Sequence, residues 1–165
     1  MDKFETNKMA ASQQNTAERV QIQVACFLHR ELPIRLAHRV VELESIPIMK
    51  ESTHVNKVVS WYKQSFEDIR NSAAPVDAEK AEVFRRVLEG IFHRHAATLI
   101  TMAKGAHEMR MMLAANQEDF SEHTELQEGL DKFYLSRIGI RTLIGQYLAL
   151  KVRSVCVGCD SCCID

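Results

Sequence analysis

The sequence is poor in proline and glycine, with three prolines and six glycines in 165 residues. Because sheets with many strands need frequent turns, this scarcity favours helices. Long apolar runs are also missing, and none approaches the roughly 20 residues that span a bilayer, so we expect no membrane insertion. At this length the chain is most simply one domain with a core of its own.

An excess of charge of either sign is absent as well. Lys and Arg number 21 and Asp and Glu number 22, which leaves a formal net charge of −1. This balance gives no electrostatic reason to bind nucleic acid or an anionic membrane.

Residues 1–15 are polar and show no apolar period, and they include Asp2 and Glu5. We predict that they are disordered and that they are neither a secretory signal nor a transit peptide.

Cysteine is scarce except at one end. Cys26 stands alone, and the other cysteines are Cys156, Cys159, Cys162 and Cys163. This distribution is not a disulfide framework. Four thiolates this close are a candidate zinc or iron–sulfur site, although adjacent Cys162 and Cys163 are a strained arrangement for one metal ion. The other interpretation is that residues 152–165 arise from translation past a splice junction after Lys151.

Apolar residues recur with helical spacing over most of the chain. The predicted helices run from Thr16 to about His29, from Pro33 to Pro47, from Thr53 to about Ile69, from Asp77 to Leu113 and from about Glu122 to Leu150. Pro33 suits the first turn of its helix, and Thr53 and Asp77 are candidate N-caps. Helices with one apolar face each must pack on one another, so we predict an all-α, antiparallel four-helix-bundle-like domain over residues 16–151.

The helix nearest the C-terminus carries the most informative interruption. Its stripe consists of residues spaced alternately four and three: Leu126, Leu130, Phe133, Arg137, Ile140, Ile144 and Tyr147. All are hydrophobic or aromatic except Arg137, which carries a permanent charge. Tyr62 and His95 interrupt the stripes of two other helices in the same way. The stripe of His95 begins at Leu88 and Ile91 and is predicted to continue through Leu99, Met102, Ala106, Met109 and Leu113.

Two interpretations of Arg137 stay open. In the first it is structural, and its guanidinium pairs with a carboxylate or reaches water. The candidate partners are Glu31, Glu42 and Asp68. In the second, the counter-charge is a small anion in an interior pocket, held by Arg137 and by Arg141 one turn later. Tyr62 and His95 would add donors. The apolar walls would be Leu36, Ile140 and Ile144.

Four segments of the chain resemble a known family. They read FLHRELPIRLAHRVVELESIP from Phe27, VSWYKQSFEDI from Val59, FHRHAATLITMAKG from Phe92 and LDKFYLSRIGIRTLIGQ from Leu130. In this order they resemble the mitochondrial pyruvate dehydrogenase kinase family, to which the branched-chain 2-oxoacid dehydrogenase kinases are closely related. The resemblance extends to about Leu150, and WYxQS and FYLSRIxIR are closer to the pyruvate branch.

The resemblance implies a regulatory site and a docking site. Family members have an N-terminal helical bundle with a pocket for pyruvate-like carboxylates. The corresponding positions here are Leu36, Tyr62, Ser65, Ile91, His95, Arg137, Ile140, Arg141 and Ile144. Phe92 stands where many relatives carry arginine, and the lost donor is expected to weaken anion binding. Phe27 corresponds to an apolar position of the region that docks lipoyl domains. The partner-subunit tail that completes that region in the family has no counterpart here.

The resemblance also implies which chemistry is missing. Family members bind Mg-ATP in a separate α/β domain with glycine-rich phosphate and lid loops. No two glycines of this sequence form a GxG pair, and the residues after Leu150 are too few for a domain of roughly 100 residues. We therefore expect no ATP-binding domain, no cofactor in this chain and no phosphate transfer by the chain alone.

Three hypotheses follow for function. The first is the regulatory and lipoyl-domain-docking bundle of a pyruvate dehydrogenase kinase-like serine kinase of the mitochondrial matrix, truncated before its catalytic domain. The resemblance implies that such a kinase phosphorylates and inactivates the dehydrogenase component, docks on lipoyl domains of the acyltransferase core and responds to pyruvate. The second is a non-catalytic module that competes for lipoyl domains or kinase partners. The third is a metal- or redox-responsive helical protein that acts through its cysteine tail.

Overall fold

A computed structural model describes the backbone of residues 3–156 and the side chains of residues 15–150. Within this part every regular element is a helix, which confirms the all-α class. The long helices are α1 (Lys3–Ser45), α3 (Thr53–Asn71), α4 (Ala78–Arg94), α5 (Thr98–Ala115) and α6 (Thr124–Cys156). The connecting elements are α2 (Pro47–Glu51) and two 3-10 turns, η1 (His95–Ala97) and η2 (Phe120–Glu122). Among the described helices, none combines the length and the apolar character that a bilayer crossing demands.

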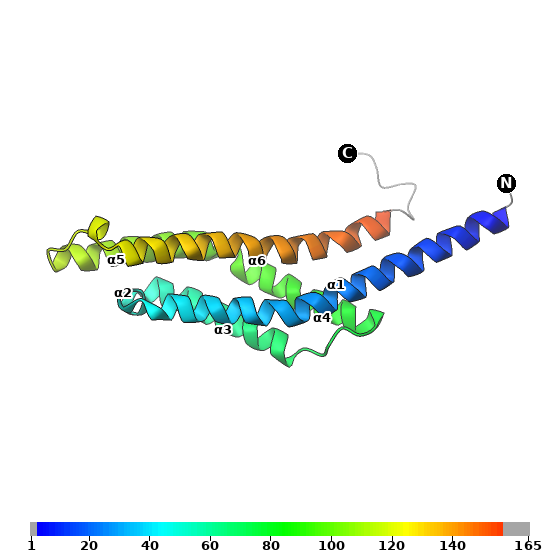
Figure 1. Cartoon of the computed structure of the whole chain (residues 1–165), viewed down its shortest axis with the longest axis horizontal. Helices are drawn as coiled ribbons and strands as arrows, with labels where there is room; N and C mark the ends of the chain where they lie inside the picture. Colours follow the sequence, from blue (N-terminus) through cyan, green and yellow to red (C-terminus); the bar gives the residue numbers. More distant parts are fainter. Residues whose placement is uncertain (1–2, 157–165) are drawn as a thin grey trace.

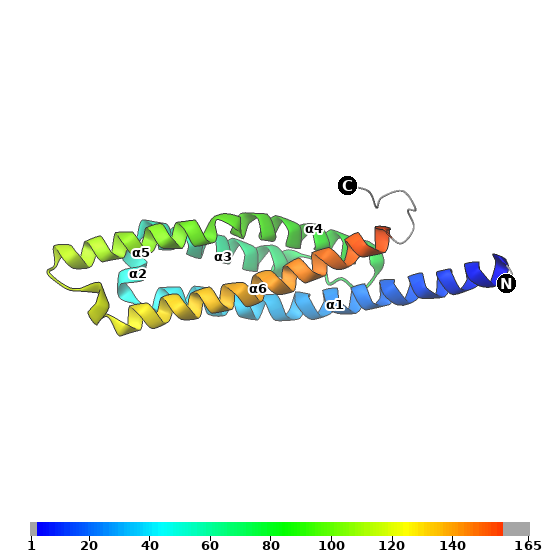
Figure 2. The ribbon, with the colours of Figure 1, turned by 90° about the horizontal axis from the view of Figure 1, so that it is seen from above.

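The long helices form an elongated antiparallel bundle (Figure 1). α1 packs against both α3 and α6, α3 also packs on α5, and α4 packs on α6. α4 and α5 follow one another along the same side of the molecule, with η1 between them (Figure 2). This arrangement confirms the bundle predicted from helices that each carry one apolar face.

α1 is one continuous helix, although the sequence predicts a new helix at Pro33. A proline inside a helix removes one main-chain hydrogen bond. However, Leu28, Leu32 and Leu36 are all fully buried and continue one stripe across the proline. Burying a leucine contributes roughly 1.5–3 kcal/mol. The packing of this face therefore holds the helix together through Pro33.

Both ends of the helical region extend further than the sequence predicts. α1 begins at Lys3, within the segment 1–15 whose composition predicts disorder. That segment contains no proline or glycine that would interrupt a helix. α6 continues past the predicted end at Leu150 to Cys156. The remaining tail cysteines, Cys159, Cys162 and Cys163, lie outside the described residues.

Single side chains fix the starts of α3 and α4. Ser52, rather than the predicted Thr53, caps α3, because its Oγ accepts a hydrogen bond from the main-chain nitrogen of Val55 at 3.2 Å. Asp77 caps α4 as predicted, and its carboxylate accepts from the main-chain nitrogen of Lys80 at 2.8 Å. Each cap satisfies a donor that the first helical turn leaves without a partner.

The long fourth helix predicted from the sequence is two helices in the structure. At His95 the backbone tightens to a 3-10 turn, which has three residues per turn instead of 3.6. The buried face of α5 therefore includes Thr98 and Gly105, beside the predicted Met102, Met109 and Leu113. The sequence predicts Leu99 and Ala106 on that face, but Leu99 is 47% exposed.

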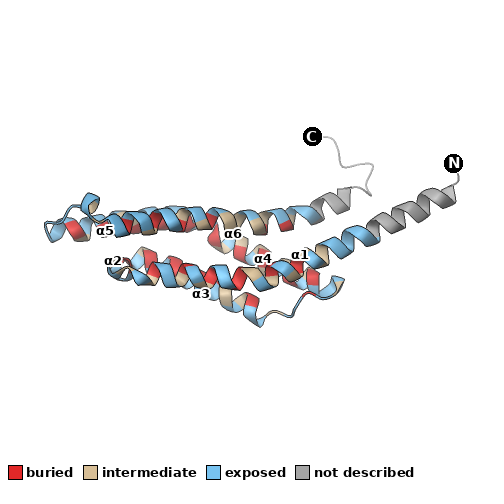
Figure 3. Ribbon diagram, viewed as in Figure 1, coloured by how far each residue is buried: buried red, intermediate tan, exposed pale blue. Residues whose placement is uncertain are grey.

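The core follows the axis of the bundle, and the buried positions of the helices face one another (Figure 3). Its largest fully buried side chains include Tyr62, Phe84 and Phe133. Every residue of the predicted α6 stripe is buried, Arg137 included. The periodicity of α6 therefore identifies its inward face correctly.

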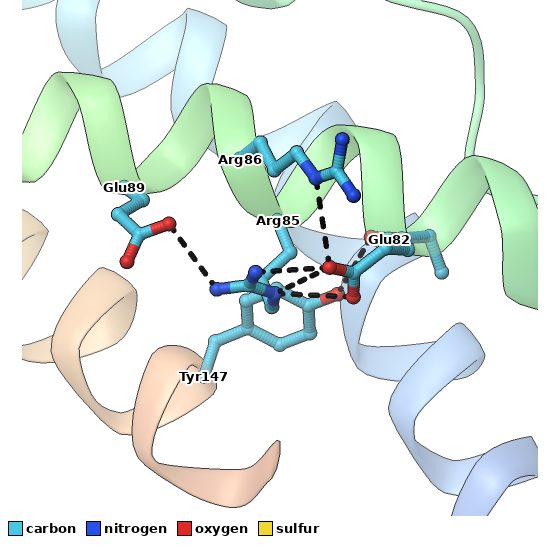
Figure 4. A network of polar contacts seen from close by, with 6 residues as sticks. Glu82, Arg85, Arg86, Glu89 and Tyr147 are labelled. Atoms are coloured by element: carbon cyan, nitrogen blue, oxygen red, sulfur yellow. Dashed lines mark hydrogen bonds and ion pairs between the residues drawn. The ribbon is translucent and has the colours of Figure 1, made fainter. Parts of the chain in front are cut away.

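A polar network covers the contact between α4 and α6 (Figure 4). Arg85 donates hydrogen bonds to Glu82 at 2.9 Å and to Glu89 at 3.3 Å. Beside this network Tyr147 reaches across from α6, and its hydroxyl donates to the main-chain oxygen of Ala81 at 3.4 Å. The contact attaches the last buried turn of α6 to the start of α4.

Candidate anion-binding site

A small cavity lies between α3, α4, η1 and α6. Its volume is about 10 Å³, which is room for about one water molecule. It is lined by Tyr62, Ile91, Phe92, His95, Arg137, Ile140, Arg141 and Ile144. The structure thus brings together the pocket residues predicted from the sequence, except Leu36 and Ser65. Leu36 is buried in the core on α1, and Ser65 contacts His95 behind the lining.

Arg137 is one of the buried residues, with 8% of its surface exposed. One terminal nitrogen donates to the main-chain oxygen of His95 at 3.3 Å. Its Nε is buried and has no hydrogen-bond partner among the described residues. Burial lowers the pKa of Arg137, and the like charge of Arg141 acts in the same direction. An arginine nevertheless stays charged, so the site holds a permanent buried cation.

The carboxylates that the sequence offers to Arg137 are each occupied by another arginine. The pairs are Glu31–Arg35, Glu42–Arg39 and Asp68–Arg94. Within residues 15–150 no ion pair involves Arg137. A structural arginine paired with a carboxylate is therefore not what the structure contains.

Tyr62 contributes a second polar atom without a partner. Its hydroxyl is buried and makes no hydrogen bond within the described residues. The ring lies 4.4 Å from the ring of His95, centroid to centroid, and 5.9 Å from that of Phe133. Burial raises the pKa of Tyr62 to about 12, although the nearby charges of Arg137 and Arg39 oppose the rise. The hydroxyl is therefore protonated at neutral pH and can donate.

His95 is held as a neutral imidazole. Its Nε2 lies 2.9 Å from Oγ of Ser65, which itself donates to the main-chain oxygen of Trp61 at 2.8 Å. A hydroxyl has one proton to give, so Nε2–H is the donor to Ser65. Burial lowers the pKa of His95 to about 4, with the charges of three arginines acting in the same direction and the Trp61 oxygen opposing them.

Arg141 is directed toward Phe92 rather than into open space. Its guanidinium carbon lies 3.8 Å from the centroid of the Phe92 ring, and its terminal nitrogen donates to the main-chain oxygen of Phe92 at 3.2 Å. The ring also packs near Gly145, where an added Cβ would lie 3.4 Å from a ring carbon. Phe92 cannot donate the hydrogen bonds that an arginine at this position would donate, and its ring and main-chain oxygen both contact Arg141.

The site as a whole is electropositive. Its lining contains two guanidinium groups, a neutral imidazole and a phenol, but no carboxylate. Two of the polar atoms, the Tyr62 hydroxyl and Arg137 Nε, are donors without an acceptor in the described structure. Such a set can accept a small carboxylate, whose oxygens take several hydrogen bonds at once.

Arg39 is a charged neighbour that the sequence analysis did not identify. It is 8% exposed on α1, it acts on the pKa of Tyr62, and it donates to the main-chain oxygen of Lys132 at 3.2 Å. Its position between buried Leu36 and Leu43 is the same kind of interruption that singled out Arg137. The signal was therefore present in the sequence.

The other predicted sites lie elsewhere. Phe27 is 47% exposed on α1 and does not line the cavity. Within the described residues no group of His, Cys, Asp and Glu is arranged to hold a metal ion. Cys156 ends α6, but its side chain is not among those described.

Comparison with known proteins shows the family of the chain. Residues 3–158 match the family described as mitochondrial branched-chain alpha-ketoacid dehydrogenase kinase. The chain belongs to this kinase family. The resemblance carried by the four sequence segments is therefore confirmed.

Several relatives of this kinase family are named pyruvate dehydrogenase (acetyl-transferring) kinases. The mitochondrial kinase of Arabidopsis thaliana is 37% identical over 134 residues, which are 81% of this chain and 35% of the relative. That of Drosophila melanogaster is 37% identical over 127 residues, or 75% of this chain and 30% of the relative. The human isozyme 3 is 35% identical over 127 residues, with the same coverage. The chain spans about a third of the length of these relatives.

Proposed function

We propose that this chain is the regulatory and docking bundle of a pyruvate dehydrogenase kinase-like enzyme, and that its pocket binds a small carboxylate such as pyruvate. Arg137 carries the proposal: it is a buried guanidinium with no carboxylate partner among the described residues, and its Nε is unbonded. A buried charge without a partner costs several kcal/mol. A bound carboxylate offsets this cost by accepting from Arg137 and from the Tyr62 hydroxyl.

The remaining lining supports a short ligand. Ile91, Ile140 and Ile144 supply apolar walls next to the donors, which suits a carboxylate with a small aliphatic body. His95 is neutral and Arg141 is stacked on Phe92, so Arg137 is left as the lining cation to meet a carboxylate. A monocarboxylate therefore matches this pocket better than a larger polyanion.

Thermal unfolding with and without pyruvate tests the proposal. A ligand at 100 times its Kd adds about 2.7 kcal/mol to the free energy of unfolding. Arg137→Ala should abolish this gain, and Arg141→Lys should reduce it less. Arg86→Ala is the matched control, because Arg86 is 71% exposed on α4 and does not line the pocket. If pyruvate does not stabilise the unmutated protein, the proposal fails.

For docking, we propose that Phe27 binds a lipoyl domain of the acyltransferase core. Phe27 offers an apolar ring that is 47% exposed. Phe27→Ala should weaken binding to a lipoylated domain in a titration. Val41→Ala, on the same helix and 65% exposed, should leave that binding unchanged. Equal binding to lipoylated and unlipoylated domains would contradict the proposal.

We infer further that the kinase containing this bundle acts in the mitochondrial matrix, with Mg-ATP as phosphate donor and the dehydrogenase component as substrate. The support is that relatives are named mitochondrial kinases of pyruvate dehydrogenase. The test is phosphate transfer to that component by the native protein, immunoprecipitated from purified mitochondria and identified by mass spectrometry. Recovery of the native protein only outside mitochondria would contradict the inference.

A further inference from the structure

Two of the residues that line the cavity differ from the rest in burial. Tyr62, Ile91, His95, Arg137, Ile140 and Ile144 are all buried. Phe92 and Arg141 are the two partly exposed members of the lining. They therefore stand between the cavity and solvent, and we call them the stacked pair.

The stacked pair is held closed by three contacts. The guanidinium of Arg141 lies 3.8 Å from the centre of the Phe92 ring, a close cation–π distance. The same guanidinium donates to the main-chain oxygen of Phe92 at 3.2 Å. Gly145 lets the ring approach α6, because no side chain intervenes there. With the pair in this position the cavity measures about 10 Å³, too little for a carboxylate with three carbon atoms.

We propose that the stacked pair is the cover of the anion pocket, and that Phe92 sets the affinity of the pocket by competing with the ligand for Arg141. The proposal rests on the carboxylate-binding function argued above. A ligand can enter only when the ring and the guanidinium separate, so the free energy of the stack is subtracted from that of binding. Removing the ring leaves Arg141 available and the entrance open.

Calorimetric titration of the full chain with pyruvate measures this competition. Phe92→Ala should lower Kd about 3- to 10-fold, which corresponds to the usual strength of a cation–π contact. Phe92→Leu keeps the apolar bulk but loses the aromatic face, and it should shift Kd in the same direction even if the alanine variant folds poorly. The matched control is Phe66→Ala, because Phe66 is also partly buried and has Arg70 at 5.7 Å but lies outside the pocket. Its Kd should not change.

The outcomes separate this inference from the function on which it rests. If the unmutated chain binds pyruvate, loses it in Arg137→Ala and shows the same or a higher Kd in both Phe92 variants, the cover is refuted and the pocket stands. If only the Phe92 variants bind, the cover is supported, but the proposed function fails for the unmutated chain. If no variant binds, both the pocket and its cover are refuted.

Discussion

Arg137 of α6 donates a hydrogen bond to the main-chain oxygen of His95, at the point where α4 ends. Arg141 does the same for the oxygen of Phe92, one turn earlier on α4. The last carbonyls of a helix carry a partial negative charge, and the His95 oxygen accepts from Arg137 in addition to the main-chain nitrogen of Thr98. Two guanidinium groups from α6 therefore cap the C-terminal end of α4 and position the residues of the pocket.

Arg137→Met separates the ligand role of this arginine from its capping role. The variant loses one hydrogen bond but no longer buries an unpaired charge, so its free energy of unfolding without ligand should stay within about 1 kcal/mol of the unmutated value. Stabilisation by pyruvate should disappear. Urea unfolding in the presence and absence of pyruvate measures both quantities. A loss above about 3 kcal/mol without ligand would show that Arg137 is chiefly structural.

His95 predicts a pH dependence of stability. Its pKa is about 4 in the folded protein against an ordinary value of 6.5. Between these values the unfolded chain binds a proton that the folded chain does not. The contribution of neutral His95 to the free energy of unfolding is therefore fully present above pH 6.5. It falls as the pH drops toward 4, with a slope approaching about 1.4 kcal/mol per pH unit. Urea unfolding from pH 4 to pH 7 measures the slope. His95→Gln should flatten it, whereas exposed His38→Gln should not; an unchanged slope in the first variant contradicts the assignment.

Glu108 of α5 ties down the start of α3. Its carboxylate accepts from Oγ of Ser52 at 2.7 Å, from the main-chain nitrogen of Thr53 at 3.2 Å, and from the main-chain nitrogen and Nδ1 of His54 at 3.3 and 3.0 Å. Hydrogen bonds from Ser52 and His54 lower the pKa of Glu108 to about 2. Its contribution is present above pH 4.5 and is lost as the pH falls toward 2.

Glu108→Ala should therefore cost about 1–2 kcal/mol at pH 7, since it leaves the main-chain nitrogens of Thr53 and His54 without their acceptor. Glu128→Ala is the control, because its i,i+4 pair with Lys132 is solvent-exposed and should contribute under about 0.5 kcal/mol. Chemical denaturation of both variants decides the matter. If both variants lose a similar free energy of unfolding, the contacts of Glu108 contribute no more than an exposed ion pair.

Two glycines inside helices should respond oppositely to alanine. At Gly90, exposed on α4, an added Cβ meets nothing within 4 Å, so Gly90→Ala should stabilise the protein by about 0.5–1 kcal/mol. At Gly105 the Cβ would lie 2.9 Å from a side-chain carbon of Val55 and 3.4 Å from its main-chain nitrogen. Gly105→Ala should be destabilising in spite of the better helix propensity. Differential scanning calorimetry gives both signs, and a gain at each site would contradict the tight packing of α5 on α3.

The sequence was sufficient where one period runs through a helix. The α6 stripe is buried at every predicted position because its spacing never changes phase. The prediction was wrong next to His95, where the 3-10 turn leaves Leu99 exposed and Thr98 buried, although Met102 further along α5 is buried as predicted. It also failed at Pro33, where tertiary packing outweighs the local cost of proline in a helix.

The chemistry of the site was predictable only in part. Tyr62, His95 and Arg137 stand out in the sequence because each places a polar group on an apolar stripe, and the structure brings all three to one cavity. Periodicity cannot show which carboxylates other arginines have already taken. Nor can it show that Phe92 and Arg141 close the entrance, because that depends on the distance between α4 and α6.

α6 is one continuous helix that connects the pocket to the C-terminal end of the described chain. The helix carries Arg137 and Arg141 in its middle and continues without a proline to Cys156. At 1.5 Å per residue, its end lies on the order of 20 Å from Arg141. Because the helix is continuous, a rotation of α6 that separates Arg141 from Phe92 would also rotate the C-terminal end of the helix.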